Sequence, residues 1–419
     1  MSIAGRLLKR LRSGFLALTI SAGVLGLAGL LVAASSRPAF AQTYKVSSSV
    51  QYELIDTWDV DKLNTILTTD FPRFAGIKAD YSPAKNAVRL YRVTYRSVVP
   101  EQNNRPVQAS GLVAIPDLER GTYPLVSYQH GTVYGKEQAP SQPDNSPETQ
   151  LMLAQFAAQG YIVIGADYFG MGQSPEPEGY LVKGSHQQAT VDMLFAARSV
   201  LQDLGLEANG LFLAGWSQGG YVTTALLERL EQIGVPVTAA ATASAPIDLA
   251  VAMMGPLNFP RKIDASWIGI TFILSAFSFE NYYSIPGLAA SVIQPQHYDA
   301  AKAVYQRDHY DPADIPTGLK ELIRPEMSEP SYFQASAFGR LIAQAEAYRR
   351  VIQVPMRNYY GETDEAIPAG LARLAMVYQQ SLGKGNDTVE AISTGNTDHR
   401  GTYAVAVPQW KAWFDGFGG

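Results

Sequence analysis

Gly215-Trp216-Ser217-Gln218-Gly219 joins an apolar run, residues 211–214, to a helix-forming segment, residues 221–230. A serine held on a sharp strand-to-helix turn needs neighbours without a Cβ atom, because the strand and the helix approach each other closely there. The turn exposes the serine hydroxyl, and the free backbone N–H of Gln218 at the start of the helix can stabilise an oxyanion. The pentapeptide therefore predicts that Ser217 is a nucleophile at the end of a buried strand.

A serine hydroxyl needs a general base, and histidine is the usual one. The histidines of the chain are His130, His186, His297, His309 and His399. The first two precede the serine, whereas this kind of turn belongs to the chain order serine, acid, histidine. The next two lie in a region rich in aromatic residues and proline, with no strand before them. His399 lies in a predicted loop, residues 393–400, that follows a predicted strand at 388–392, and we predict that it is the base.

The acid that orients this histidine is expected in the loop after another strand, residues 354–360. Three carboxylates crowd that loop: Glu362, Asp364 and Glu365. We predict that Asp364 is the acid and that the other two are solvated, while Asp398 is too close in sequence to orient His399 easily. The 35 residues from Asp364 to His399 accommodate one helix and one strand, which is a single crossover unit.

A second oxyanion donor is expected in Gln129-His130-Gly131-Thr132, after a strand predicted at 123–128. Gly131 permits a tight turn there, so the N–H of Thr132 is the predicted donor and that of Gly131 the alternative. We expect His130 to hydrogen-bond the loop rather than to transfer a proton.

Alternating apolar residues at 88–95 and 107–115, separated by a turn at 103–106, predict an antiparallel hairpin. Strands and helices then alternate as far as residue 245, which is typical of a parallel α/β sheet. Roughly a hundred residues then precede the next predicted strand at 354, far more than a crossover helix needs.

Five motifs occur in a characteristic order: Gln129-His130-Gly131-Thr132, Asp167-Tyr168-Phe169-Gly170-Met171-Gly172, Gly215-Trp216-Ser217-Gln218-Gly219-Gly220, Gly361-Glu362-Thr363-Asp364 and Asp398-His399-Arg400-Gly401. Over residues 91–417 the chain thus resembles the α/β-hydrolase superfamily, and within it the bacterial relatives of the secretory lipases. The resemblance implies an eight-stranded, mostly parallel sheet with helices on both faces and a helical cap inserted after the sixth strand. It also implies a catalytic triad of Ser217, Asp364 and His399. In one departure, Thr132 and Val133 follow Gly131 where lipases of the HGGG type have consecutive glycines.

The first 41 residues are predicted to be a signal peptide. Basic residues between Arg6 and Arg12 precede an uncharged apolar stretch, 14–34, and Ala39-Phe40-Ala41 is a suitable cleavage site. We therefore expect a secreted or periplasmic protein. The alternative is an uncleaved membrane anchor, because the apolar stretch is long enough to span a bilayer. Membrane contact is expected only through this segment.

The composition excludes several classes of function. After cleavage the chain would carry 28 basic and 38 acidic residues, a net charge of −10, so nucleic acid is a poor partner. The absence of cysteine excludes disulfides, thiolate metal sites and a cysteine nucleophile. The sequence has no H-E-x-x-H motif, and we expect neither a metal nor a cofactor.

The expected segments are the signal peptide (1–41), an N-terminal extension (42–85), the first part of the hydrolase core (86–245), a cap (246–350) and the second part of the core (351–419). The cap contains an apolar stretch, 265–279, that fits either a pocket for acyl chains or the cap's own core. The sequence as a whole predicts a serine esterase or lipase that cleaves small-molecule or lipid esters through an acyl-enzyme. A peptidase or acyltransferase on the same fold, or a non-catalytic exported binding protein, is the alternative.

Overall fold

The computed structural model describes residues 43–383 and 387–418, which belong to one compact unit. The predicted signal peptide lies outside the described residues. None of the helices in these two ranges combines the length and the apolar character that crossing a bilayer requires.

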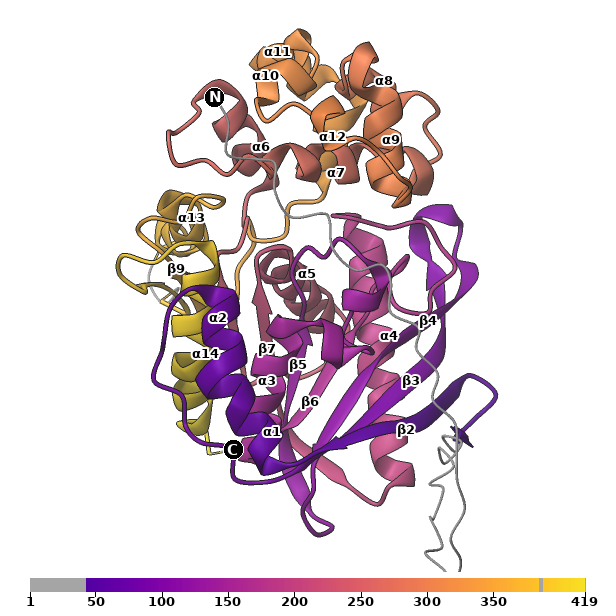
Figure 1. Ribbon diagram of the computed structural model, residues 1–419, viewed down its shortest axis with the longest axis vertical. Coiled ribbons are helices and arrows are strands. Elements are labelled where there is room, and N and C mark those ends of the chain that lie inside the picture. The colour runs from indigo at the N-terminus through magenta and orange to yellow at the C-terminus, as the bar shows by residue number, and fades with distance from the viewer. Residues whose placement is uncertain (1–42, 384–386, 419) are drawn as a thin grey trace, which may run out of the picture. The chain divides into compact units, whose positions relative to one another are not determined.

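A single mixed sheet forms the centre of the described chain (Figure 1). Its strands are β1 (Thr43–Lys45), β2 (Val50–Trp58), β3 (Val88–Val99), β4 (Arg105–Pro116), β5 (Thr122–Gln129), β6 (Ile162–Ala166), β7 (Glu207–Trp216), β8 (Ala239–Ala243), β9 (Met356–Tyr360) and β10 (Val389–Ser393). Their order is β1-β2-β3-β4-β6-β5-β7-β8-β9-β10. Along the sheet, the adjacent strands β1, β2, β3, β4 and β6 pair antiparallel. The adjacent strands β6, β5, β7, β8, β9 and β10 pair parallel.

The prediction of eight strands was wrong, because the described residues form a ten-stranded sheet. The two additional strands, β1 and β2, come from the predicted N-terminal extension. β2 pairs with β3, so two strands precede the hairpin of β3 and β4 in the sheet, and the predicted hairpin itself is confirmed. The strand order also explains the burial pattern: all residues of β6 and β8 are buried, as expected for parallel strands covered on both faces.

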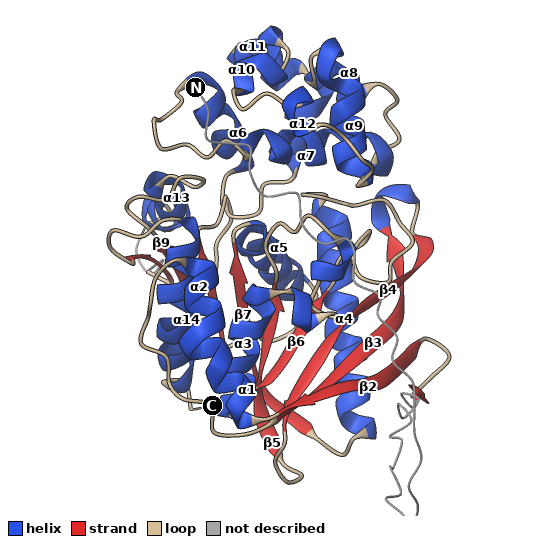
Figure 2. Ribbon diagram, in the orientation of Figure 1, coloured by secondary structure: helices blue, strands red, loops and turns tan. Residues whose placement is uncertain are grey.

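Helices cover both faces of the sheet, as predicted (Figure 2). They are α1 (Val60–Thr65), α2 (Phe71–Ala75), α3 (Pro147–Gln155), α4 (Lys183–Asp203), α5 (Gln218–Gln232), α13 (Ala369–Ser381) and α14 (His399–Asp415). One apolar core includes α4 and α5, and the other includes α1, α2, α3 and α14. The two faces of the sheet therefore have separate cores.

Seven α-helices lie between β8 and β9, and we call them the helical insertion. They are α6 (Leu249–Asn258), α7 (Ile268–Tyr282), α8 (Leu288–Val292), α9 (Tyr298–Gln306), α10 (Leu319–Leu322), α11 (Pro330–Ala335) and α12 (Ala337–Gln344). In Figure 1 they form one group. The insertion follows the sixth of the strands that the sequence predicted, but β8 is the eighth strand along the described chain because β1 and β2 precede the hairpin.

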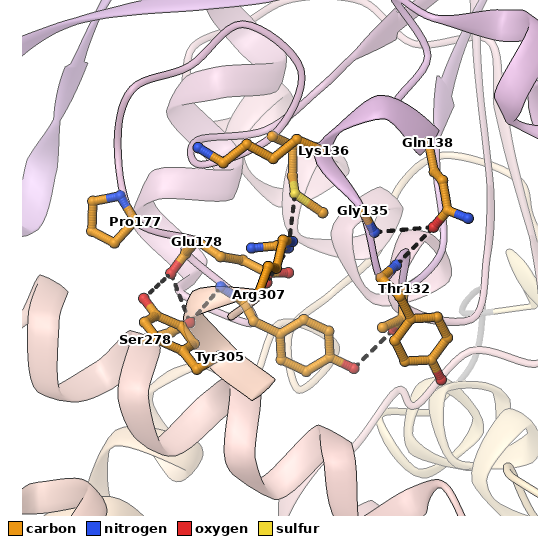
Figure 3. A network of polar contacts seen from close by, with 12 residues as sticks. Thr132, Gly135, Lys136, Gln138, Pro177, Glu178, Ser278, Tyr305 and Arg307 are labelled. Atoms are coloured by element: carbon orange, nitrogen blue, oxygen red, sulfur yellow. Dashed lines mark hydrogen bonds and ion pairs between the residues drawn. The ribbon is translucent and has the colours of Figure 1, made fainter. Parts of the chain in front are cut away.

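Polar contacts join the helical insertion to the loop between β6 and α4 (Figure 3). The carboxylate of Glu178, only 4% exposed, pairs with Arg307 at 2.7 Å. The backbone carbonyl oxygen of Glu178 accepts hydrogen bonds from the hydroxyl groups of Ser278 at 2.8 Å and Tyr305 at 2.7 Å. In the same loop, the N–H of Tyr180 donates to the Ser278 hydroxyl. Two helices of the insertion thus hold residues 178–180 in place.

Candidate active site

Ser217 lies on the turn between β7 and α5, with φ 57° and ψ −124°. A positive φ is costly for a residue with a side chain, so the surrounding structure must enforce it. A Cβ atom at Gly215 would overlap the carbonyl oxygen of Gly219, and one at Gly219 would overlap that of Gln129. The flanking glycines are therefore required by the close approach of helix and strand, as the sequence predicted.

The structure brings Ser217, His399 and Asp364 together. Nε2 of His399 lies 2.9 Å from Oγ of Ser217, and Nδ1 lies 3.1 Å from each carboxylate oxygen of Asp364. His399 is the first residue of α14, and Asp398 caps this helix by accepting from the N–H of Gly401 at 2.7 Å. The expectation of a loop as far as residue 400 was wrong, since α14 begins at the histidine.

Asp364 is held by the backbone that follows it. Its Oδ1 accepts hydrogen bonds from the N–H groups of Ala366 and Ile367, both at 2.8 Å. Glu365 differs from the expectation of a solvated side chain, because it is half-buried and accepts from the backbone N–H of His399 at 2.9 Å. Glu362 is exposed, as expected, and accepts from a serine hydroxyl. Of the loop's carboxylates, Asp364 is thus the one that contacts the imidazole.

The opposite charges in this cluster raise the pKa of His399 and lower that of Asp364. Burial alone would lower the pKa of His399, but the charge and hydrogen bond of Asp364, aided by Glu365 and Asp398, raise it above its ordinary value. Burial alone would raise the pKa of Asp364, but the contacts with His399 and the N–H of Ile367 lower it. The carboxylate is therefore ionised at neutral pH and can stabilise an imidazolium.

Two backbone N–H groups are available for an oxyanion. Within the described ranges, neither the N–H of Gln218 nor that of Thr132 is paired with an acceptor. By contrast, the N–H of Gly131 donates to Oε2 of Glu148 at 2.9 Å. Between the two alternatives at this loop, the geometry therefore favours Thr132, whose hydroxyl also contacts the phenol of Tyr180 at 3.0 Å.

His130 has contacts that fit a structural role. Its Nδ1 lies 2.7 Å from the carbonyl oxygen of Gly131 and its Nε2 lies 3.1 Å from that of Asp167. The ring stacks on Tyr168 with 4.1 Å between centroids. His186 is buried, and burial lowers its pKa to about 3, so it stays neutral and accepts from the N–H of Leu181.

Sequence reasoning missed Glu148 and Tyr180. Glu148 is 4% exposed, and besides Gly131 it accepts from the hydroxyl of Tyr128 at 2.5 Å. In the sequence it is an acidic residue in the first turn of a predicted helix, a common and usually solvated position. Tyr180 reaches Thr132 from 48 residues away. Neither contact has a local sequence signal.

Two cavities meet at Ser217. One is a cleft of about 470 Å³ whose lining includes His399, Asp398 and Arg400. The other is a pocket of about 50 Å³ whose lining includes Gln218 and Ile268. A third cavity, of about 720 Å³, lies between α6, α11 and α12 of the helical insertion, and Ser217, Asp364 and His399 are not part of its lining.

Comparison with solved structures identifies the fold. The chain is similar to a protein of Legionella pneumophila described provisionally as a hydrolase, with a TM-score of 0.74 and 22% identity over 87% of this chain and 97% of that one. It is also similar to the rice cell wall degrading esterase LipA of Xanthomonas oryzae, with a TM-score of 0.69 and 24% identity over 86% and 95% of the two chains. Candida antarctica lipase A has a TM-score of 0.55 and 16% identity, covering 83% of this chain and 77% of that one.

These likenesses show that the chain has the α/β-hydrolase fold that its motifs predicted. No model of a known protein family matches the sequence, and no curated protein matches it. The narrower resemblance to the secretory lipases therefore stays a prediction.

Proposed function

We propose that this protein hydrolyses carboxylic esters through an acyl-enzyme formed on Ser217. The observation that carries the proposal is the continuous hydrogen-bonded path from Oγ of Ser217 through the imidazole of His399 to the carboxylate of Asp364. The structures of an esterase and a lipase with the same fold lend support. We further propose that the protein is exported by its N-terminal segment and acts on small-molecule or lipid esters.

In this mechanism, Oγ of Ser217 attacks the ester carbonyl while Nε2 of His399 accepts the hydroxyl proton. The N–H groups of Gln218 and Thr132 stabilise the negative charge on the carbonyl oxygen. When the tetrahedral intermediate collapses, the C–O bond to the alcohol breaks and His399 returns the proton to the departing oxygen. A water molecule then attacks the acyl-enzyme by the same steps, which releases the acid and restores the serine hydroxyl.

Replacement of the nucleophile tests this proposal. Ser217→Ala should abolish hydrolysis of p-nitrophenyl butyrate and labelling by a fluorophosphonate probe, while circular dichroism and the melting temperature stay close to wild type. Ser199→Ala is the matched control, because this serine lies on α4 and its hydroxyl bonds only within its own helix. Activity of Ser217→Ala at a rate near wild type would refute the assignment.

A second assay separates the proposal from its alternatives. Esters, amides and peptides of matched acyl groups should be compared with and without acceptor alcohols. Faster cleavage of amides would favour a peptidase, and transfer to the alcohol would favour an acyltransferase. Failure of the wild-type protein to react with the probe would favour a non-catalytic binding protein.

A further inference from the structure

The two cavities at Ser217 differ in size, charge and position relative to the histidine. The cleft of about 470 Å³ is lined by His399, by the ionisable side chains of Glu148, Glu365, Asp398 and Arg400, and by uncharged residues that include several aromatic ones. The pocket of about 50 Å³ is lined mostly by apolar side chains and by no charged residue. Ser217 and Thr132 line both. A bound ester would therefore place its two halves in different surroundings.

The position of His399 decides which half of the ester enters which cavity. Its Nε2 must give a proton to the departing alcohol oxygen, so the alcohol has to lie on the histidine's side of the serine. His399 lines the cleft and not the pocket. The acyl group consequently extends into the pocket, next to Gln218, and the alcohol lies in the cleft.

The volume of the pocket limits the acyl group. One water-sized probe occupies roughly 10–15 Å³, and a cavity of roughly 150 Å³ accommodates the six carbon atoms of benzene. On the first scale the 50 Å³ pocket has room for about three to five heavy atoms, and on the second for about two. The cleft, at 470 Å³, falls within the range of ordinary small-molecule sites.

Side chains from the helical insertion form part of the pocket lining. Met253 of α6 and Ile268 of α7 are 3% and 7% exposed, and Thr271 lies one turn further along α7. Other residues of α7, such as Phe272 and Ile273, are buried in the larger apolar core. The apolar stretch that the sequence left open between two roles therefore takes both, since its first turn lines the pocket and its later turns form core.

We propose that the preferred substrates are esters of short acyl groups, of about two to four carbons, with bulky polar alcohols. This inference rests on the proposed ester hydrolysis by Ser217. Ile268 and Thr271 act as residues that set the acyl length, because their side chains line a pocket too small for a longer chain. The charged lining of the cleft favours an alcohol that carries further hydroxyl groups, which can hydrogen-bond to its carboxylates.

The first test is the acyl-length profile of the wild-type protein. For p-nitrophenyl esters, kcat/KM for acetate and butyrate should exceed that for octanoate and laurate at least tenfold. For the alcohol half, glyceryl monobutyrate should be cleaved with a higher kcat/KM than ethyl butyrate. A profile that rises towards octanoate or laurate overturns the acyl half of the proposal, and a preference for ethyl butyrate overturns the alcohol half.

Two opposite substitutions test these residues of the pocket lining. Ile268→Ala should raise the octanoate-to-butyrate ratio of kcat/KM at least fivefold, and Thr271→Leu should lower the butyrate-to-acetate ratio by a similar factor. Ile270→Ala is the matched control, because this α7 residue is absent from the lining of both cavities and should leave both ratios unchanged.

The readouts are ratios, so a partial loss of folded protein does not change them. Unchanged ratios in both variants would overturn the assignment of the pocket. Absence of hydrolysis at every chain length, together with no reaction with the fluorophosphonate probe, would overturn the proposed function as well. Hydrolysis with the reverse length preference would overturn this inference alone.

Discussion

Asp364→Asn is the substitution whose effect follows most directly from the site's geometry. Oδ1 of Asp364 accepts from two backbone N–H groups, those of Ala366 and Ile367, at 2.8 Å. In the asparagine variant these donors require the side-chain oxygen at that position. The amide nitrogen must then occupy the place of Oδ2. Both positions lie 3.1 Å from Nδ1 of His399, but the lone pairs of Oδ1 are already taken by the two backbone donors, so the amide nitrogen is the group that pairs with Nδ1. The variant should therefore fold normally, with an N–H donor facing the imidazole.

That change selects the wrong histidine tautomer. Nδ1 becomes the acceptor, so the proton moves to Nε2, which then points a donor at Ser217 and cannot accept the serine proton. The same substitution in a comparable triad lowers kcat by about 10⁴-fold, which corresponds to about 5.5 kcal/mol of transition-state stabilisation. We expect a loss of similar size here.

The pH profile gives a second readout of the same change. His399 must be neutral to act as a base, and its pKa is raised from 6.5, so wild-type kcat/KM should rise with pH through a value above 6.5. In Asp364→Asn the charge that raises the pKa of His399 is lost, while burial still lowers this pKa. The residual activity of the variant should therefore rise at a lower pH than that of wild type. The measurement is kcat/KM for p-nitrophenyl butyrate from pH 5 to 9.

Glu362→Gln is the control for this experiment, because Glu362 belongs to the same loop but is exposed, and its carboxylate accepts from Ser393 rather than from His399. It should retain wild-type activity and the wild-type pH profile. A loss of less than tenfold in Asp364→Asn, or an unshifted pH profile, would contradict the tautomer argument. A large loss in Glu362→Gln would show that the wrong carboxylate has been assigned.

Three further substitutions test features around the site. Tyr180→Phe removes the hydroxyl that contacts Thr132 at 3.0 Å. It should lower kcat severalfold with little change in KM, because the oxyanion donor acts in the transition state. An equal change in kcat and KM would argue against a role for Tyr180 in placing this donor. Gly219→Ala forces a Cβ atom against a backbone carbonyl and should lower the free energy of unfolding, measured in urea titrations, by about 3 kcal/mol. A stability near wild type would contradict the close approach of helix and strand. Arg307→Met leaves the buried carboxylate of Glu178 without its partner and should cost about 3–5 kcal/mol at pH 7. Because burial raises the pKa of Glu178, this deficit should shrink as the pH falls towards 5, and an equal deficit at both pH values would exclude the ion pair as its cause.

The sequence predicted the convergence of Ser217, Asp364 and His399 because each of these residues follows a recognisable strand. In a parallel sheet the carboxyl ends of neighbouring strands lie at one edge, so chain order and strand ends were enough to bring the three side chains together. Their catalytic roles stay part of the proposal. The contacts of Glu148 could not be predicted, because its partners lie in a different element and nothing near it in the sequence indicates burial.

The strand β2 was missed for an identifiable reason. Its pairing with β3 shifts register between Leu54 and Asp56, which is the mark of a bulge. A bulge puts one additional residue into the strand, so the alternation of buried and exposed positions breaks at that point. The two halves of β2 are each too short to be recognised by a period of two. The strand count therefore depended on a pairing that only the folded chain reveals.

The segment before β3 has a practical consequence for any shortened version of the protein. β2 hydrogen-bonds along β3, the phenol of Tyr52 donates to Asp203 of α4 at 2.6 Å, and Phe74 of α2 forms part of the cleft wall. A recombinant chain starting at residue 86 would expose β3 as a sheet edge that can pair with other molecules and precipitate. Expression trials and directed-evolution libraries should therefore retain everything from Thr43 onward.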